Sequence, residues 1–190
     1  MRERITFRKV AQRIRVPAGF VLAPLLLIAA RPTRGSLIAG VLLALAGLAI
    51  RAWASGHLRK NQELCVAGPY AYTRNPLYLG TFVMGAGVAV ATGALWFVAI
   101  FIAFYLVIYL PVMSAEADYM RELFPDDYQI YSRQVPLFFP RLTPYRPPGA
   151  RGRLSQGFDM RLFLRHREYR AAIGVAFVLA LIAARYFFRI

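Results

Sequence analysis

The sequence contains one cysteine, Cys65, two histidines and only two lysines among its 24 basic residues. A single cysteine excludes an intrachain disulfide. His57 and His166 have no second ligand at the spacing of a metal site, so no metal centre is predicted. Acidic residues are also scarce, with nine in the whole chain, and no Gly-x-Gly-x-x-Gly fingerprint of a dinucleotide-binding fold is present.

Long apolar runs without charged residues make up much of the sequence. Hydrophobic residues make up 58% of the 190 positions, beside a net charge of +15. A soluble nucleic-acid-binding domain can be this basic, but it does not carry long uncharged apolar runs, so a nucleic-acid partner is not expected. A membrane protein needs apolar spans and basic loops together. Open sheets cannot cross lipid, and no barrel-like alternation is visible. We therefore expect an all-α, multi-span membrane bundle that forms a single domain over residues 1–190.

Five segments are predicted to be transmembrane helices. The first is short and holds two prolines, and the third and fourth are separated only by Thr92-Gly93, which predicts a tight helical hairpin. The fifth is interrupted by Arg185, and the alternative is that it does not cross the membrane. Glycines along the spans predict close helix packing. The five segments are Val16–Ala30, Leu37–Ala54, Leu77–Thr92, Ala94–Met113 and Ala171–Phe188.

The basic residues predict the orientation. If the N-terminus lies inside, 20 of the 24 basic residues fall on the cytoplasmic side, leaving only Arg31, Arg34, Arg185 and Arg189 outside. Membrane lipids are therefore expected partners of a basic cytoplasmic face. The bias toward arginine and alanine is typical of a GC-rich prokaryotic genome, which would make this an inner or plasma membrane protein.

The polar stretch Lys60–Gly80 between the second and third spans is rich in residues that a simple connector does not need. Gly68-Pro69 indicates a tight bend. Asn75-Pro76 is a helix start signal, with Asn at the N-cap and Pro in the first turn. A helix N-terminus at this point favours an anionic ligand group such as a carboxylate. The tyrosines of the stretch can be interfacial anchors or members of a site.

Here the sequence resembles a known family. GPYAYTRNPLYLG, residues 68–80, resembles the signature of the isoprenylcysteine carboxyl methyltransferase and phospholipid methyltransferase group, integral membrane enzymes that use S-adenosylmethionine. A second family element, an acidic residue after the last core span followed by a Tyr pair and a Pro, is matched over residues 116–140. Three positions depart from the pattern: Asn75 replaces His, Ala117 follows Glu116 where a second Glu is common, and Pro125 replaces Gly.

The resemblance covers residues 51–141, which form the methyltransferase-like core, and it implies a cofactor pocket at the cytoplasmic face. S-Adenosylmethionine would be the cofactor and S-adenosylhomocysteine the product. The implied catalytic residues are Glu116, which would pair with the cofactor's amino group or ribose hydroxyls, and Arg133, which would orient a substrate carboxylate or phosphate. The alternative for Glu116 is a salt bridge to Arg121 or Arg51, and the alternative for Arg133 is that it is one more lipid-facing basic residue. Asn75 can form hydrogen bonds as a His can, but it cannot become charged. The implied cofactor-binding residues are Lys60, Leu64, Gly68, Pro69, Tyr70, Asn75, Pro76, Tyr78 and Glu116.

Residues 142–190 lie outside the resemblance. A Pro/Gly-rich linker is followed by an expected interfacial helix over Phe158–Arg170, capped by Asp159, and then by the fifth predicted span. The function implied is transfer of a methyl group to a lipophilic acceptor: an isoprenylcysteine carboxylate, a phospholipid amine or a thiol. The alternatives are a non-catalytic lipid-binding or assembly protein, and a membrane reductase with a related helical core.

Overall fold

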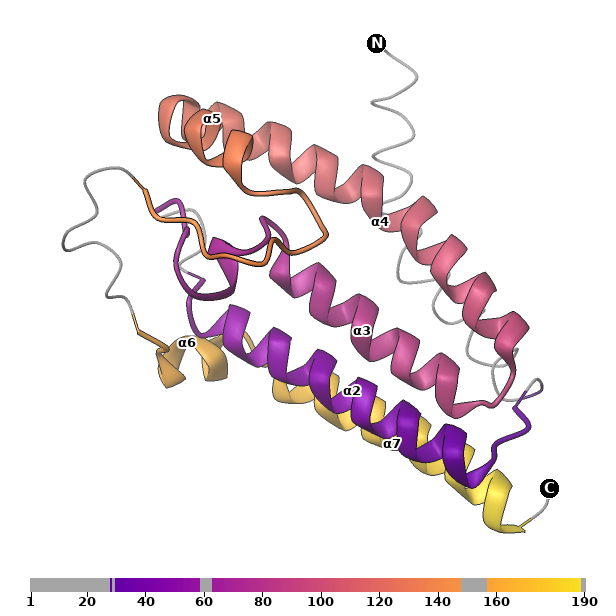
Figure 1. The fold of residues 1–190 in the computed structure, drawn as a ribbon. Helices are drawn as coiled ribbons and strands as arrows, with labels where there is room; N and C mark the ends of the chain where they lie inside the picture. The colour runs from indigo at the N-terminus through magenta and orange to yellow at the C-terminus, as the bar shows by residue number, and fades with distance from the viewer. Residues whose placement is uncertain (1–27, 29, 59–62, 148–156, 189–190) are drawn as a thin grey trace.

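The computed structural model describes residues 28, 30–58, 63–147 and 157–188 (Figure 1). In these ranges the chain is all-helical, as predicted, with six α-helices and one short 3-10 turn. The helices are α2 (Arg34–Ser55), α3 (Pro76–Ala91), α4 (Leu95–Leu123), α5 (Pro125–Gln134), α6 (Met160–Arg165) and α7 (Tyr169–Phe188), and the turn is η1 (Gly68–Ala71).

Three helices, α2, α4 and α7, are long and apolar enough to cross a membrane, and α3 is an apolar helix of 16 residues. At 1.5 Å per residue, α3 is roughly 24 Å long, somewhat less than the ~30 Å hydrocarbon layer. The second to fifth predicted spans therefore appear as helices at the expected places. All of the first, Val16–Ala30, except residues 28 and 30, lies outside the described residues.

The helices α2 and α3 pack antiparallel with their backbones in contact. A Cβ atom added to Gly47 would lie 2.3 Å from the Met84 backbone nitrogen, and one added to Gly87 would lie 2.4 Å from the Ala44 nitrogen. Side chains cannot relieve such contacts, so these positions accept only glycine. The prediction of glycine-mediated helix packing is confirmed here, since small residues let membrane helices approach closely. Gly40 and Gly80 complete this interface.

The tight hairpin between α3 and α4 is also confirmed. Its turn contains Gly93 at φ +74°, a conformation that favours glycine. The Tyr105 hydroxyl, in the first half of α4, donates to the Tyr78 carbonyl in the first turn of α3 at 2.6 Å and ties the two helices together. With 29 residues, α4 is roughly 43 Å long. Its last turns therefore extend beyond a ~30 Å hydrocarbon layer and carry Glu116 toward the polar segments.

After α5 the chain turns back over the start of α3. Figure 1 shows this return segment, residues 135–147 in orange, running beside η1. Its Pro136 carbonyl accepts a hydrogen bond from the Arg74 N–H at 3.0 Å, and its Tyr145 N–H donates to the Ala71 carbonyl at 2.9 Å. The two sequence motifs, although about 40 positions apart, therefore lie side by side.

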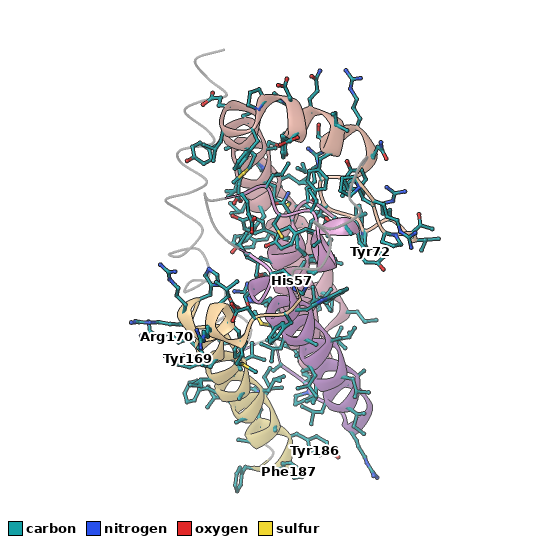
Figure 2. All side chains as sticks on the ribbon, turned by 90° about the vertical axis from the view of Figure 1, so that its left-hand side faces the viewer. His57, Tyr72, Tyr169, Arg170, Tyr186 and Phe187 are labelled. Atoms are coloured by element: carbon teal, nitrogen blue, oxygen red, sulfur yellow. The ribbon has the colours of Figure 1, made fainter. Side chains whose placement is uncertain are left out.

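The tail, residues 157–188, forms α6 and α7, and α7 lies alongside α2 (Figure 1). Asp159 caps α6 as predicted, its carboxylate accepting from the Arg161 N–H at 2.8 Å. The helix is shorter than the predicted Phe158–Arg170, because Arg167 adopts φ +55° and breaks it before α7 begins. Figure 2 shows Tyr169 at one end of α7 and Tyr186 and Phe187 at the other, the arrangement of aromatic residues at two membrane interfaces.

Candidate functional site

A cavity of about 500 Å³ lies where the two motifs, the ends of α2 and α4, and the tail meet. Its volume falls within the range of roughly 300–1,000 Å³ typical of small-molecule sites. Six of the residues predicted from the sequence to bind the cofactor line it. They are Leu64, Tyr70, Asn75, Pro76, Tyr78 and Glu116.

The other predicted residues lie elsewhere. Gly68 and Pro69 belong to η1 behind the lining: Pro69 is buried, and Gly68 has φ +57° with the His57 ring closely packed on it. Arg133 lies exposed on α5 and is not among the residues that line the cavity. Lys60 lies outside the described residues.

Glu116 enters the cavity from α4 without either of the ion-pair partners considered for it from sequence. Arg121 is paired with Asp118, with 3.0 Å between Nη1 and Oδ1. Arg51 is paired with Glu168. Within the described part of the chain, both arginines are therefore engaged by other carboxylates, and the Glu116 carboxylate is available to a ligand.

Asn75 occupies the N-cap position of α3, followed by Pro76 in the first turn, as the sequence indicates. Its side chain does not cap the helix. Instead, its amide nitrogen donates to the carbonyl of Leu137 in the return segment, at 2.9 Å. Asn75 is 8% exposed, so this bond is largely protected from water. One amide proton of Asn75 thus joins the first motif to the second.

Buried tyrosines form the wall between η1 and α5. The Tyr131 hydroxyl donates to the Tyr70 carbonyl at 2.6 Å. Burial raises the pKa of both the Tyr70 and the Tyr131 hydroxyls above the ordinary value. Both hydroxyls therefore stay protonated at neutral pH, so neither is a phenolate nucleophile or base, and the Tyr131 hydroxyl serves as a hydrogen-bond donor.

Two lining residues that the sequence analysis did not single out carry buried polar atoms without a partner among the described residues. One is Nε of Arg74, a residue inside the first motif whose Nη1 donates to the Tyr128 hydroxyl at 3.0 Å. The other is Nδ1 of His166, between α6 and α7. The motif itself contains Arg74, so a signal for it was present. No local pattern marks His166.

A partly buried ion pair closes the cavity where α2 and α3 meet the tail. Arg51 binds the Glu168 carboxylate through two nitrogens, with Nε to Oε2 at 2.8 Å and Nη2 to Oε1 at 3.0 Å. Its third nitrogen, Nη1, donates to the Thr81 hydroxyl on α3. This geometry ties three segments together and fixes one edge of the site.

Over the part of the chain that the structure describes, the lining combines the unpaired Glu116 carboxylate, an arginine whose Nε has no partner, and several tyrosine rings. Such a set suits a zwitterionic ligand that also carries a cationic or aromatic part. Among the described residues, no group of three or more His, Cys, Asp or Glu side chains is placed to hold a metal ion.

Comparison with known proteins relates this region to a family. Residues 36–127 match the family model described as phospholipid methyltransferase, so this part of the chain is similar to that family. The cobalt-zinc-cadmium resistance protein CzcN of Cupriavidus metallidurans is 33% identical over 140 residues, which cover 70% of this chain and 64% of that protein. The nickel-cobalt-cadmium resistance protein NccN of Alcaligenes xylosoxydans xylosoxydans is 35% identical over 109 residues, covering 56% and 49%. The chain thus spans less than two thirds of either relative, and no solved structure matches it.

Proposed function

We propose that this chain, whose residues 36–127 match the phospholipid methyltransferase family model, is a membrane enzyme that transfers a methyl group from S-adenosylmethionine to a lipophilic or amphiphilic acceptor. One observation carries the proposal. Residues from both motifs, Tyr70 and Asn75 from the first and Glu116 from the second, line one cavity at the polar end of a bundle of apolar helices. We predict that this cavity lies at the cytoplasmic face of the membrane.

The lining residues fit the polar parts of the cofactor. S-Adenosylmethionine supplies both the methyl group and the leaving group, so the protein has mainly to bind, orient and exclude water. The Glu116 carboxylate would bind an ammonium or ribose hydroxyl group, and the unused Nε of Arg74 would bind a carboxylate. The rings of Tyr78 and Tyr109 lie on the same wall, with centroids 5.7 Å apart, and would favour a sulfonium cation.

The acceptor is expected to keep an apolar part in the bilayer. The helices that lead up to the cavity expose large apolar side chains on their outer faces, such as Leu42 on α2 and Val107 on α4. Such faces are solvated by lipid acyl chains, while the cavity at their polar end suits a head group. Of the three acceptor types implied by the resemblance, a prenylcysteine carboxylate and a phospholipid amine meet this requirement, and a thiol meets it only when it carries an apolar chain.

Calorimetry of the purified chain with S-adenosylhomocysteine tests the proposal. We expect saturable binding by the wild-type protein, weakened roughly ten-fold or more by Glu116→Gln, because a charged hydrogen bond contributes about 1.5–3 kcal/mol. Asp118→Asn is the matched control: Asp118 is on the same helix, exposed and outside the cavity lining, and its loss should leave affinity unchanged. Absence of binding by folded wild-type protein would contradict the proposal.

Two other functions predict different outcomes. A non-catalytic lipid-binding protein would bind lipid vesicles but neither S-adenosylhomocysteine nor the methyl donor. A membrane reductase would require a nicotinamide cofactor. The names of the two relatives describe metal resistance. Among the residues that the structure describes, no three His, Cys, Asp or Glu side chains lie close enough together to hold a metal ion.

A further inference from the structure

One wall of the cavity comes from beyond the range matched by the family model. That match ends at residue 127, whereas His166 lines the cavity from the tail. Of the two histidines in the sequence, only His166 lines it. The Nδ1 atom of His57 lies 2.9 Å from the Trp53 carbonyl, whereas Nδ1 of His166 is buried without a partner in the described residues.

The position of His166 is held on both sides along the chain. Before it, the Asp159 N–H donates to the Gly56 carbonyl at 2.9 Å, and Phe158 packs so closely on Gly56 that a Cβ there would lie 2.3 Å from the ring. After it, Glu168 binds Arg51 at 2.8 Å. Figure 2 shows the start of α7, marked by Tyr169 and Arg170, at the end of that helix nearest His57. A residue anchored in this way is placed to contact a ligand repeatedly in one geometry.

The position of His166 along the chain indicates whether it lies near the cofactor or near the methyl acceptor. It lies three residues before the first residue of α7, an apolar helix long enough to cross the membrane. An amphiphilic acceptor has its head group at this depth, between the apolar helices and the polar motifs. The carboxylate and arginine suited to the cofactor, Glu116 and Arg74, come instead from α4 and the first motif.

We propose that His166 binds the protic head group of the methyl acceptor and takes its proton, which makes the acceptor an amine or a thiol rather than a carboxylate. This inference rests on the proposed function. The proton on the acceptor nitrogen or sulfur would pass first to Nδ1 of His166 and then to solvent, which frees a lone pair on that atom. The lone pair would form the new bond to the methyl carbon, and the bond from that carbon to the sulfonium sulfur would break with its electrons going to sulfur. A carboxylate acceptor carries no such proton.

The experiment uses the full chain in lipid nanodiscs and compares wild type with His166→Ala. Methyl incorporation from labelled S-adenosylmethionine is measured into phosphatidylethanolamine, a long-chain alkyl thiol and a prenylcysteine carboxylate. S-Adenosylhomocysteine affinity is measured in parallel by calorimetry. We expect incorporation into the amine or the thiol, a loss of about 100-fold or more in His166→Ala, and an affinity within about two-fold of wild type. Added imidazole should restore part of the lost rate, as it would not for a structural defect.

The outcomes separate the two proposals. Normal turnover by His166→Ala, turnover on the carboxylate alone, or a lost rate that imidazole does not restore would overturn the role of His166 and leave the methyltransferase standing. Failure of the wild type to bind S-adenosylhomocysteine would overturn both. Arg121→Ala, which removes only an exposed ion pair, is the control and should match wild type in every measurement.

Discussion

We expect the ion pair between Arg51 and Glu168 to hold the start of the tail against the cavity. We consider Glu168→Gln, which keeps the shape of the side chain and removes its charge. The two side chains are only 20% and 11% exposed, so Arg51 would lose a bidentate partner in a place that water reaches poorly. Its bond to Thr81 remains. The loss corresponds to a charged hydrogen bond, about 1.5–3 kcal/mol.

The lost interaction energy should increase the frequency with which the tail opens by an amount that can be measured. Because 1.4 kcal/mol corresponds to a factor of ten, opening of residues 157–168 should become roughly 10- to 150-fold more frequent. Hydrogen exchange measured by mass spectrometry reports this directly, since exchange follows local opening. Peptides that cover α6 should exchange faster by that factor, while peptides from the α2–α3 interface should not change.

A matched substitution tests whether burial is the reason. Asp118→Asn breaks the other ion pair of the described residues, whose side chains are 57% and 44% exposed. Exposed pairs contribute about 0–1 kcal/mol, so exchange near the end of α4 should rise no more than about five-fold. If Glu168→Gln leaves exchange in α6 as it is in the wild type, the tail is held by its apolar contacts and the reasoning from the ion pair is refuted.

Two further substitutions test the packing beneath the site. Gly47→Val places a branched side chain against the Met84 backbone and should lower the free energy of unfolding by about 1–3 kcal/mol or more, whereas Gly174→Ala, with open space around it, should not; thermal unfolding in detergent distinguishes them. Tyr131→Phe leaves the buried Tyr70 carbonyl without its donor and should cost about 1–3 kcal/mol at neutral pH. Because burial raises the pKa of the Tyr131 hydroxyl, the wild-type protein loses stability as the pH rises above about 10. Tyr131→Phe has no hydroxyl to ionise, so the difference in free energy of unfolding between wild type and variant should shrink above this pH. An equal difference at pH 7 and pH 11 would contradict this reasoning.

The helices and the meeting of the two motifs were predictable because each has a strong local cause. Apolar runs near 20 residues form membrane helices, and a proline such as Pro76 is favoured in the first turn of a helix. Once α3 and α4 form a tight hairpin, the residues before one and after the other must lie at the same end. The family resemblance implied the six predicted residues that line the cavity, and the hairpin explains why they lie together. The shortened α6 was not predicted, because the φ of +55° at Arg167 has no sequence signal.

The contribution of the tail could not be predicted, and the reason is physical rather than a matter of a missed motif. Arg51 and Glu168 are 117 positions apart in the sequence. An arginine near the end of an apolar span is equally consistent with an ion pair and with a side chain that extends to the membrane surface without a partner. Nothing in the sequence selects among the nine carboxylates for its partner. The structure makes that choice through α7, which lies along α2 and carries Glu168 just before its first turn. Any chain of this kind that lacks α7 would have to neutralise Arg51 in another way, and its cavity would lose the wall that holds His166.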